Sequence, residues 1–412
     1  MTGTVSGKTS RELSRYDVGT TLEIEVGAVA HGGHCVSRVD GRVVFVRHAL
    51  PGERVVAEIT EDKGGSYCRA DAVRVLRAAP GRVEPPCPLA VPGACGGCDW
   101  QHAAPELQRE LKARVVAEQL SRLAGIERET EVEELPGGML GWRTRMRLVA
   151  GRDGRAGLRG HRGHDVIALP DCPIAVPGIL EPVVSRRWRP GSEVEVTSDG
   201  DGRPHVREQT SARGRRQTRQ LRGGRAVEHA AGRDWKLDAH GFWQVHPAAA
   251  DTLAEVVGRW ARVPEGGRAW DLYAGVGLFA SVLAGQAGPR GEVVAVESNR
   301  GAVADGEANL ADLPQVSWRA GRVEHVVRDL GEGGAPDVVV LDPPRAGAGR
   351  AVVESIVEVA PARVVYVACD PAALARDLAT FAGHGYSLAD LRAFDAFPMT
   401  HHVECVALVE RG

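Results

Sequence analysis

Hydrophobic and polar positions alternate over short stretches in the first part of the chain. Between residues 20 and 76, short runs rich in Val and Ile are separated by Gly, Pro or charged turns. This spacing is typical of a small all-β barrel, because each strand of such a barrel buries every second side chain. We therefore expect a small β-barrel over residues 18–79.

The pattern changes after residue 80, where Pro, Gly and Cys become frequent. Apolar residues then recur every three or four positions within residues 104–124, which predicts an amphipathic helix. Residues 140–175 return to strand and turn patterns, whereas residues 186–225 are Arg-rich and loop-like. We expect a central α+β domain over residues 80–240.

From about residue 241, apolar runs typical of buried strands alternate with stretches typical of helices. The predicted strands are RAWDLY, GEVVAVE, DVVVLD, RVVYVA and HVECVALVE. Strands that alternate with helices form a mostly parallel sheet with helices on both faces. The chain is thus expected to be a multi-domain α/β protein whose residues 241–412 form a Rossmann-like, doubly wound domain.

The composition excludes several classes of protein. Hydrophobic residues make up 43% of the 412 residues and charged residues 25%, which is ordinary for a globular protein. No run approaches the roughly 18 apolar residues of a membrane helix. Residues 1–17 are polar and lack the apolar core of a secretory signal, so we expect a disordered tail, a cytoplasmic location and no membrane contact.

A glycine-rich turn follows one predicted strand and precedes a predicted helix. In WDLYAGVGLFA, residues 270–280, Gly275 and Gly277 would let the backbone approach a ligand at a helix N-terminus. Glu297 ends the next predicted strand, at a spacing that suits a carboxylate binding ribose hydroxyls. The AxGxG form is more typical of S-adenosylmethionine (SAM) enzymes than of nicotinamide enzymes, and the alternative is a plain turn without a ligand.

Reactive side chains stand at two other strand ends and at the start of a third strand. Asp342 follows one buried strand and Cys369 follows another, and ligands of open α/β sheets bind at these ends. A Cys near a helix N-terminus is favoured as the thiolate. Glu404 enters the last predicted strand where an apolar residue would be usual. The alternatives are a buried structural thiol for Cys369 and a solvent-exposed edge residue for Glu404.

The eight Cys residues are too sparse for a disulfide scaffold, and some of them are clustered. Cys87, Cys95 and Cys98 have the spacing of metal ligands, and Cys172 could complete a set of four thiolates. Structural zinc, an iron–sulfur cluster and unrelated free thiols are all compatible with this pattern. We expect three of the other Cys residues to lie in the protein core: Cys35, Cys68 and Cys405.

Several stretches together resemble one enzyme family over nearly the whole chain. They are GFWQVHP, DLYAGVGLF, VAVES, LDPPRAG, YVACDPAALARD and FPMTHHVE. The chain resembles the RNA (uracil-5-)-methyltransferases, which use SAM to make 5-methyluridine. The resemblance implies that the N-terminal barrel is a TRAM-like RNA-binding domain. It also implies a [4Fe–4S] cluster on the four clustered Cys residues, because CGGCDWQH matches the cluster-binding stretch of the family.

The resemblance assigns roles that the chemistry of the residues supports. C5 of uracil is a poor nucleophile, and a thiolate that adds to C6 makes C5 able to accept a methyl group. Cys369 matches the nucleophile, Glu404 matches the base that removes the C5 proton, and Asp342 would lie beside the base and the cofactor. The matching SAM contacts are Gln244, Tyr273, Gly275, Gly277, Leu278, Glu297 and Asp342, and Phe242 would pack against the target base.

Two positions depart from the family pattern. Leu278 stands where the family usually has Asn, and Asp370 stands where Cys-Asn-Pro is usual. A carboxylate at Asp370 would oppose formation of the Cys369 thiolate. We expect these changes to affect the rate and the pH optimum rather than the type of reaction.

Local basic patches would have to bind RNA, because the formal net charge of the chain is −3. In WRTRMRLV, Arg143, Arg145 and Arg147 share one face of a predicted strand and suit phosphates or stacked bases. Eight Arg residues and a single acid lie between Arg203 and Arg225, where they could contact the RNA backbone. The alternatives are a salt-bridged solvated face and a mobile loop whose Arg content reflects codon bias.

The resemblance favours large-subunit ribosomal RNA as the substrate, because family members that act on tRNA often lack the cluster. tRNA and an RNA cytosine-5 reaction are alternatives on the same scaffold, as is an RNA-binding protein without catalysis. We expect a monomer, since each domain has its own role and no association motif stands out.

Overall fold

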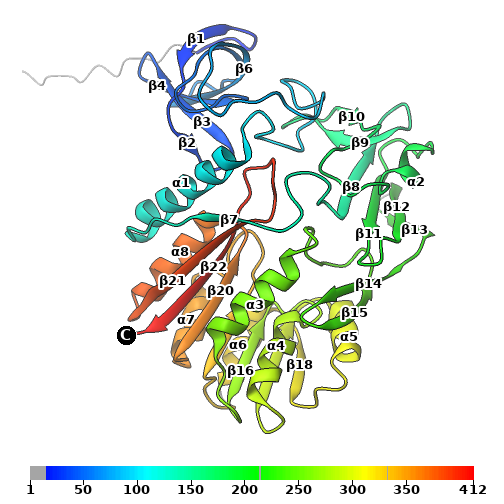
Figure 1. The fold of residues 1–412 in the computed structure, drawn as a ribbon, viewed down its shortest axis with the longest axis vertical. Coiled ribbons are helices and arrows are strands. Elements are labelled where there is room, and N and C mark those ends of the chain that lie inside the picture. The colour runs from blue at the N-terminus through cyan, green and yellow to red at the C-terminus, as the bar shows by residue number, and fades with distance from the viewer. Residues whose placement is uncertain (1–14, 213–214, 332) are drawn as a thin grey trace, which may run out of the picture.

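The computed structural model describes residues 15–212, 215–331 and 333–412. Most of the expected N-terminal tail, residues 1–14, lies outside the described residues. The chain forms a barrel at the top of Figure 1, a central sheet at the right and a larger sheet with flanking helices below. In the part of the chain that is described, each helix is too short or too polar to cross a membrane.

The N-terminal region is the expected small β-barrel. Its strands pair in the order β1-β5-β6-β4-β3-β2. Alternate side chains of these strands, such as Val44, Val46 and Val55, are fully buried in one apolar core. The strands are β1 (Thr21–Glu25), β2 (Val29–Ala30), β3 (His34–Val39), β4 (Arg42–Arg47), β5 (Arg54–Glu61) and β6 (Tyr67–Arg77).

The central region begins with the expected helix, α1 (Pro105–Ala124), which ends at Gly125 in the left-handed conformation. A sheet follows in the order β10-β9-β8-β11-β12-β13, and a hairpin of two more strands precedes the C-terminal sheet. These elements are β8 (Arg145–Ala150), β9 (Ala156–Arg159), β10 (Val166–Ala168), α2 (Glu181–Val184), β11 (Glu193–Ser198), β12 (Pro204–Ala212), β13 (Arg215–Arg222), β14 (Arg225–Ala230) and β15 (Arg233–Asp238).

The prediction of a loop over residues 186–225 is wrong, because β11, β12 and β13 lie there. The strand β13 is exposed on nearly all of its side chains. A strand that is exposed on both faces has no reason to alternate between apolar and polar residues, so the period-two signal of a strand is missing from its sequence.

The C-terminal sheet has the order β18-β17-β16-β19-β20-β22-β21-β7. Strands β16 to β20 are parallel, while β22 is antiparallel to both β20 and β21. The strands are β16 (Arg268–Leu272), β17 (Glu292–Glu297), β18 (Val316–Ala320), β19 (Val338–Leu341), β20 (Arg363–Ala368), β21 (Tyr386–Asp395) and β22 (Glu404–Arg411). The expected doubly wound, Rossmann-like sheet is confirmed.

Helices cover both faces of this sheet and bury two separate apolar clusters against it. The helices are α3 (Ala249–Ala261), α4 (Leu278–Ala287), α5 (Arg300–Asn309), α6 (Val323–Gly331), α7 (Arg350–Glu358) and α8 (Pro371–Ala382). The edge strand β7 (Val132–Glu134) comes from the region expected to form the central domain and pairs with β21. The C-terminal sheet therefore includes a strand that precedes the expected domain boundary at residue 240.

A buried ion pair joins α1 to the C-terminal sheet. The Nζ of Lys112 lies 2.6 Å from Oδ1 of Asp395 and donates to the Phe397 carbonyl oxygen at 3.1 Å. Both charged side chains are almost completely excluded from water. Helix α1 also packs against α8, so the region before the sheet is fixed to its last strands (Figure 1).

We expect Lys112→Met to destabilise the protein by about 3–5 kcal/mol, because it leaves the Asp395 carboxylate buried without its cation. The double variant Lys112→Met, Asp395→Leu should recover most of this loss, since neither charge is then buried. The midpoint of urea denaturation of the full chain measures both effects. A single variant as stable as the wild type would show that the pair does not fix α1 to the sheet.

Candidate active site

The three reactive groups meet at one edge of the C-terminal sheet. Asp342 follows β19 and Cys369 follows β20, so both lie at the carboxyl edge of the parallel strands. Because β22 runs antiparallel to β20, its first residue, Glu404, lies at the same edge. The register pairs Ala368 with Cys405, and one further step places Cys369 opposite Glu404. The structure thus brings together three residues that are spread over the sequence between Asp342 and Glu404.

Burial dominates the electrostatics of this cluster. Glu404 is 4% exposed, and burial raises its pKa well above the ordinary value, with a further increase from Asp342. Asp342 retains some accessible surface, but its carboxyl group is desolvated and its pKa rises to about 7. The pKa of Cys369 rises to about 12, first through burial and then through Glu404 and Asp342, while Arg345 opposes the increase. Burial thus disfavours the charged form of each of the three groups.

Helix α8 begins directly after Cys369 and Asp370, while burial and the neighbouring acids raise the pKa of Cys369 and so favour its thiol. Asp370 occupies the N-cap of α8, where its Oδ1 accepts a hydrogen bond from the Ala373 amide at 2.8 Å. Its Oδ2 lies 3.0 Å from Nε2 of His31 in the barrel. These contacts outweigh burial and lower the pKa of Asp370. The departure from Asn thus serves a helix cap and a contact between domains.

The glycine-rich turn lies at the same edge, after β16. Glu297, at the end of β17, accepts hydrogen bonds from the Gly275 amide at 3.0 Å and the Asn299 amide at 2.7 Å. A Cβ at Gly275 would meet no atom within 4 Å, so the turn is open to a ligand there. Tyr273 precedes the turn with a φ of +63°. Oε2 of Glu297 therefore helps to hold the turn in place through the Gly275 amide.

The two glycines of the turn have different roles. A Cβ at Gly277 would lie 2.8 Å from Leu310 and 3.0 Å from the Trp318 ring, so this glycine permits internal packing rather than ligand approach. Its φ of +93° is also a conformation that other residues rarely adopt. Leu278 begins α4 and is buried in the core.

Asp271 is a residue of this edge that the sequence reasoning missed. It is fully buried in β16, and its Oδ2 accepts a hydrogen bond from the Ala280 amide of α4 at 2.7 Å. Burial raises its pKa to about 8, and Asp342 and Glu297 contribute to the increase. An acid between the apolar residues Trp270 and Leu272 of a strand is the signal that could have identified it. His31 had no such signal, because its partner lies in another domain.

Phe242 and Gln244 precede the sheet, in the segment that follows β15. The Phe242 side chain is 70% exposed, although its neighbour Trp243 is buried. Such an exposed aromatic ring is available to stack on a ligand. Gln244 is partly buried beside it.

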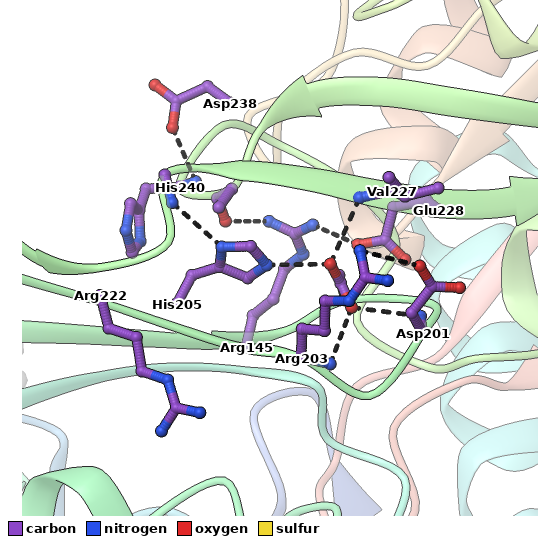
Figure 2. Close-up of polar contacts among 12 residues, drawn as sticks. Arg145, Asp201, Arg203, His205, Arg222, Val227, Glu228, Asp238 and His240 are labelled. Atoms are coloured by element: carbon purple, nitrogen blue, oxygen red, sulfur yellow. Dashed lines mark hydrogen bonds and ion pairs between the residues drawn. The ribbon is translucent and has the colours of Figure 1, made fainter.

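Arg145 holds this segment in place (Figure 2). Its guanidinium donates to the carbonyl oxygens of Ala239 at 2.8 Å and Gly241 at 2.9 Å, and to Glu228 at 2.7 Å. The neighbouring pair of His205 and Asp199, 2.9 Å apart, completes the network. Both terminal nitrogens of Arg145 therefore have internal partners, while its buried Nε has none among the described residues, and the side chain is not a free phosphate ligand.

The three Arg side chains expected to form one row, Arg143, Arg145 and Arg147, lie in different environments. Arg147 is on the same face of β8 as Arg145 and is 64% exposed, with an ion pair to Glu195 at 2.8 Å. Arg143 precedes the strand and lines the cavity formed by the clustered Cys residues. Of the three, Arg147 is the most accessible to RNA.

The clustered cysteines Cys87, Cys95, Cys98 and Cys172 line a single small cavity between loops of the central region. Burial raises the pKa of Cys98 to about 12. Within the described ranges, however, no three His, Cys, Asp or Glu side chains are arranged to hold one metal ion. The remaining thiols expected in the core are indeed buried: Cys35, Cys68 and Cys405.

The loop that carries Cys98 is hydrogen-bonded to the turn before Glu404. The amides of Asp99 and Trp100 both donate to the Met399 carbonyl oxygen at 3.0 Å. Oδ2 of Asp99 lies 2.6 Å from Nδ1 of His401 and accepts from the His401 amide at 3.1 Å. The cysteine loop therefore supports the chain segment that delivers Glu404 to the sheet edge.

Comparison with known proteins agrees with this arrangement. Sequence models of the TRAM domain and of tRNA (uracil-5-)-methyltransferase match residues 15–73 and 333–412. An RNA methyltransferase of Streptomyces avermitilis, described as uncharacterized, is 46% identical, with 95% of this chain and 99% of the relative covered. A similarly described protein of Corynebacterium glutamicum is 39% identical, with 97% and 98% covered.

A solved structure has the same fold. The tRNA (uracil-54, C5)-methyltransferase of Pyrococcus abyssi, in complex with S-adenosyl-L-homocysteine, matches with a TM-score of 0.70 and 21% identity. The match covers 94% of this chain and 100% of the other. With the near full-length relatives and the two matching sequence models, the chain belongs to the SAM-dependent RNA (uracil-5-)-methyltransferase family.

Proposed function

We propose that this enzyme methylates C5 of uridine in structured RNA through a covalent adduct with Cys369. The observation that carries the proposal is the meeting of Cys369, Glu404 and Asp342 at one sheet edge, beside the open turn at Gly275. The same residues would serve no purpose in an RNA-binding protein without catalysis, because burying acids and a thiol together costs stability.

The residues at the turn fit SAM. Gly275 leaves open space at the end of β16, Glu297 ends β17, and Tyr273, Gln244 and Asp342 would complete the contacts. When bound, SAM supplies an electrophilic methyl group on a sulfonium cation, whose positive charge favours the ionised forms of nearby carboxyl and thiol groups. Gly277 lets the turn pack closely against Trp318, and Leu278 is buried in the core at the start of α4, so both would support the site by packing.

The reaction follows from the positions of the side chains. Sγ of Cys369, as the thiolate, adds to C6 of the uracil, and the electron pair moves to C5. C5 then forms a bond to the methyl group while the bond between that methyl group and the sulfonium sulfur breaks, which would leave S-adenosyl-L-homocysteine. Glu404, as the carboxylate, then removes the C5 proton. The electrons of that C–H bond restore the C5–C6 double bond as Sγ leaves C6. Phe242 would pack against the base that has been extruded from the RNA.

We predict that Glu404→Gln accumulates a denaturation-resistant adduct of protein and RNA in the presence of SAM, because addition precedes proton removal. Cys369→Ala should form no adduct and lose at least about 10³-fold in turnover, since the nucleophile is absent. End-labelled RNA on a denaturing gel measures the adduct. The matched control is Cys68→Ala, which removes a buried thiol from the barrel and should react as the wild type does. Methylation by Cys369→Ala would contradict the mechanism.

Two classes of RNA are candidate substrates. We propose large-subunit ribosomal RNA, supported by the clustered Cys residues that this chain carries. tRNA is the second candidate, favoured by the description of the matching sequence model and by the substrate in the name of the Pyrococcus abyssi enzyme. Exposed Arg residues on β13, together with Arg147, would contact the RNA backbone. The cytoplasm is the proposed location of this activity.

We also propose that Cys87, Cys95, Cys98 and Cys172 hold a [4Fe–4S] cluster. They line one cavity, which supports a shared ligand. A zinc ion needs all four sulfurs within about 2.3 Å of one point, whereas each Cys of a cubane cluster binds a different iron. Among the described residues, no three His, Cys, Asp or Glu side chains surround a single point, so the proposal rests on the cavity that the four Cys residues share. The role of the cluster would be structural, through the contact of Asp99 with His401.

Anaerobically purified protein should contain about four iron and four sulfide ions per chain. Cys98→Ser should lose most of this iron, because it removes one of the four ligands, while Cys68→Ser should retain it. Elemental analysis of iron, sulfide and zinc measures the content. Stoichiometric zinc, or unchanged iron in Cys98→Ser, would contradict the assignment.

A further inference from the structure

A cavity of about 400 Å³ lies between the barrel and the central region, outside the active site. Strands β3, β4, β5 and β6 form one wall, and the loops around residues 91–95 and 160–165 form the other, together with Ile167 of β10. Its volume is within the usual range for small-molecule sites and is sufficient for a single nucleotide. The barrel and the loops of the central region face one another at the top of Figure 1.

Three nitrogen atoms in its lining are buried without a hydrogen-bond partner. They are Nε2 of His34, Nη2 of Arg47 and Nε of Arg69. The Arg47 side chain is only 7% exposed, and the nearest carboxylate oxygen to its Nη2, from Asp99, is 3.6 Å away. Nε of Arg69 lies 3.5 Å from Glu61. Leaving such groups without a partner is unfavourable, and a polar ligand in the cavity would satisfy them.

The same cavity offers a surface on which a planar group can stack. Phe45 lines it, with the Arg69 guanidinium 5.4 Å from the ring centroid. The rings of His34 and Phe45 meet edge to face at 6.0 Å, and His34 meets His161 in the same way. Aromatic rings and guanidinium planes are the surfaces on which unstacked RNA bases are held.

The charges around the cavity discriminate between ligands. Arg47, Arg69 and Arg162 are balanced by Glu61, Asp71 and Asp165. A phosphate placed among these acids would be repelled, so the phosphate of a bound nucleotide would lie outside the cavity, whereas a base that has both acceptors and donors would satisfy both sets of charged groups. Guanine presents O6 and N7 to an Arg, and its N1–H and N2–H groups can donate to a carboxylate.

We propose that this cavity binds an unstacked guanine of the RNA substrate, separate from the target uridine. The inference rests on the proposed RNA substrate and adds a second base-recognition site to it. Binding a neighbouring base outside the helical stack would help to offset the cost of extruding the target.

The cavity is directly connected to the catalytic region. Arg47 faces Asp99, whose carboxylate binds His401 in the turn before Glu404. Gly33 packs so closely against this turn that a Cβ there would lie 2.9 Å from Cβ of His401. A base bound beside His34 and Arg47 would therefore anchor the RNA one layer of side chains from the active site.

Saturation-transfer difference NMR on the full chain tests the proposal with GMP, AMP, UMP and CMP as probes. Saturating S-adenosyl-L-homocysteine blocks the cofactor site, and the phosphate common to all four probes makes any difference report the base. We expect GMP to give at least threefold more saturation transfer than the others. Arg69→Gln and Phe45→Leu should each reduce the GMP signal at least fivefold.

The matched control is Arg74→Gln, which removes the same charge from the exposed side of β6 and should leave the GMP signal unchanged. Equal signals for all four nucleotides, or an undiminished signal in both cavity variants, would overturn the proposal. RNA methylation by the same wild-type preparation separates the two inferences. Methylation without GMP binding refutes the cavity assignment alone, and GMP binding without methylation refutes the proposed function alone.

Discussion

The antiparallel pairing of β22 with β20 is the constraint on which the catalytic arrangement depends. In an all-parallel sheet, the residue that begins a strand lies at the edge opposite to the residues that follow the other strands. Because β22 is reversed, Glu404 begins at the edge where Cys369 and Asp342 follow their strands. Hydrogen bonds on both sides of β22 hold this register, so Cys369, the proposed nucleophile, lies opposite Glu404, the proposed base.

The pairing of β22 with β20 places acids and a thiol together away from water, which is electrostatically unfavourable. Contacts from other parts of the chain stabilise the segments that carry these groups. The two carboxyl groups and the thiol are desolvated together; Asp342 further raises the pKa of Glu404, and both acids further raise the pKa of Cys369. The barrel contributes His31 beside Asp370, and the cysteine loop contributes Asp99 beside His401. The N-terminal domain and the central loop therefore support the two chain segments that carry the catalytic groups, in addition to any contact with RNA.

The sequence predicts those features that depend on local pattern. Alternation located the barrel strands, and buried apolar runs located the strands that end at Glu297, Asp342 and Cys369. It could not predict β13, whose exposed faces carry no alternation, or β7, which is stabilised only by its distant partner β21. Strand periodicity correctly placed Arg145 and Arg147 on one face, but the buried role of Arg145 depends on carbonyl groups nearly 100 residues away.

The methylated nucleoside that the enzyme makes distinguishes the candidate reactions most directly. The direct measurement is methyl transfer from labelled SAM to unmodified ribosomal RNA and tRNA in separate reactions, with the labelled nucleoside identified by mass spectrometry. We predict label in 5-methyluridine, with ribosomal RNA as the better substrate. Label in 5-methyluridine from tRNA alone would correct the RNA class and keep the chemistry. Label in another nucleoside, or none with SAM binding verified, would contradict the central claim.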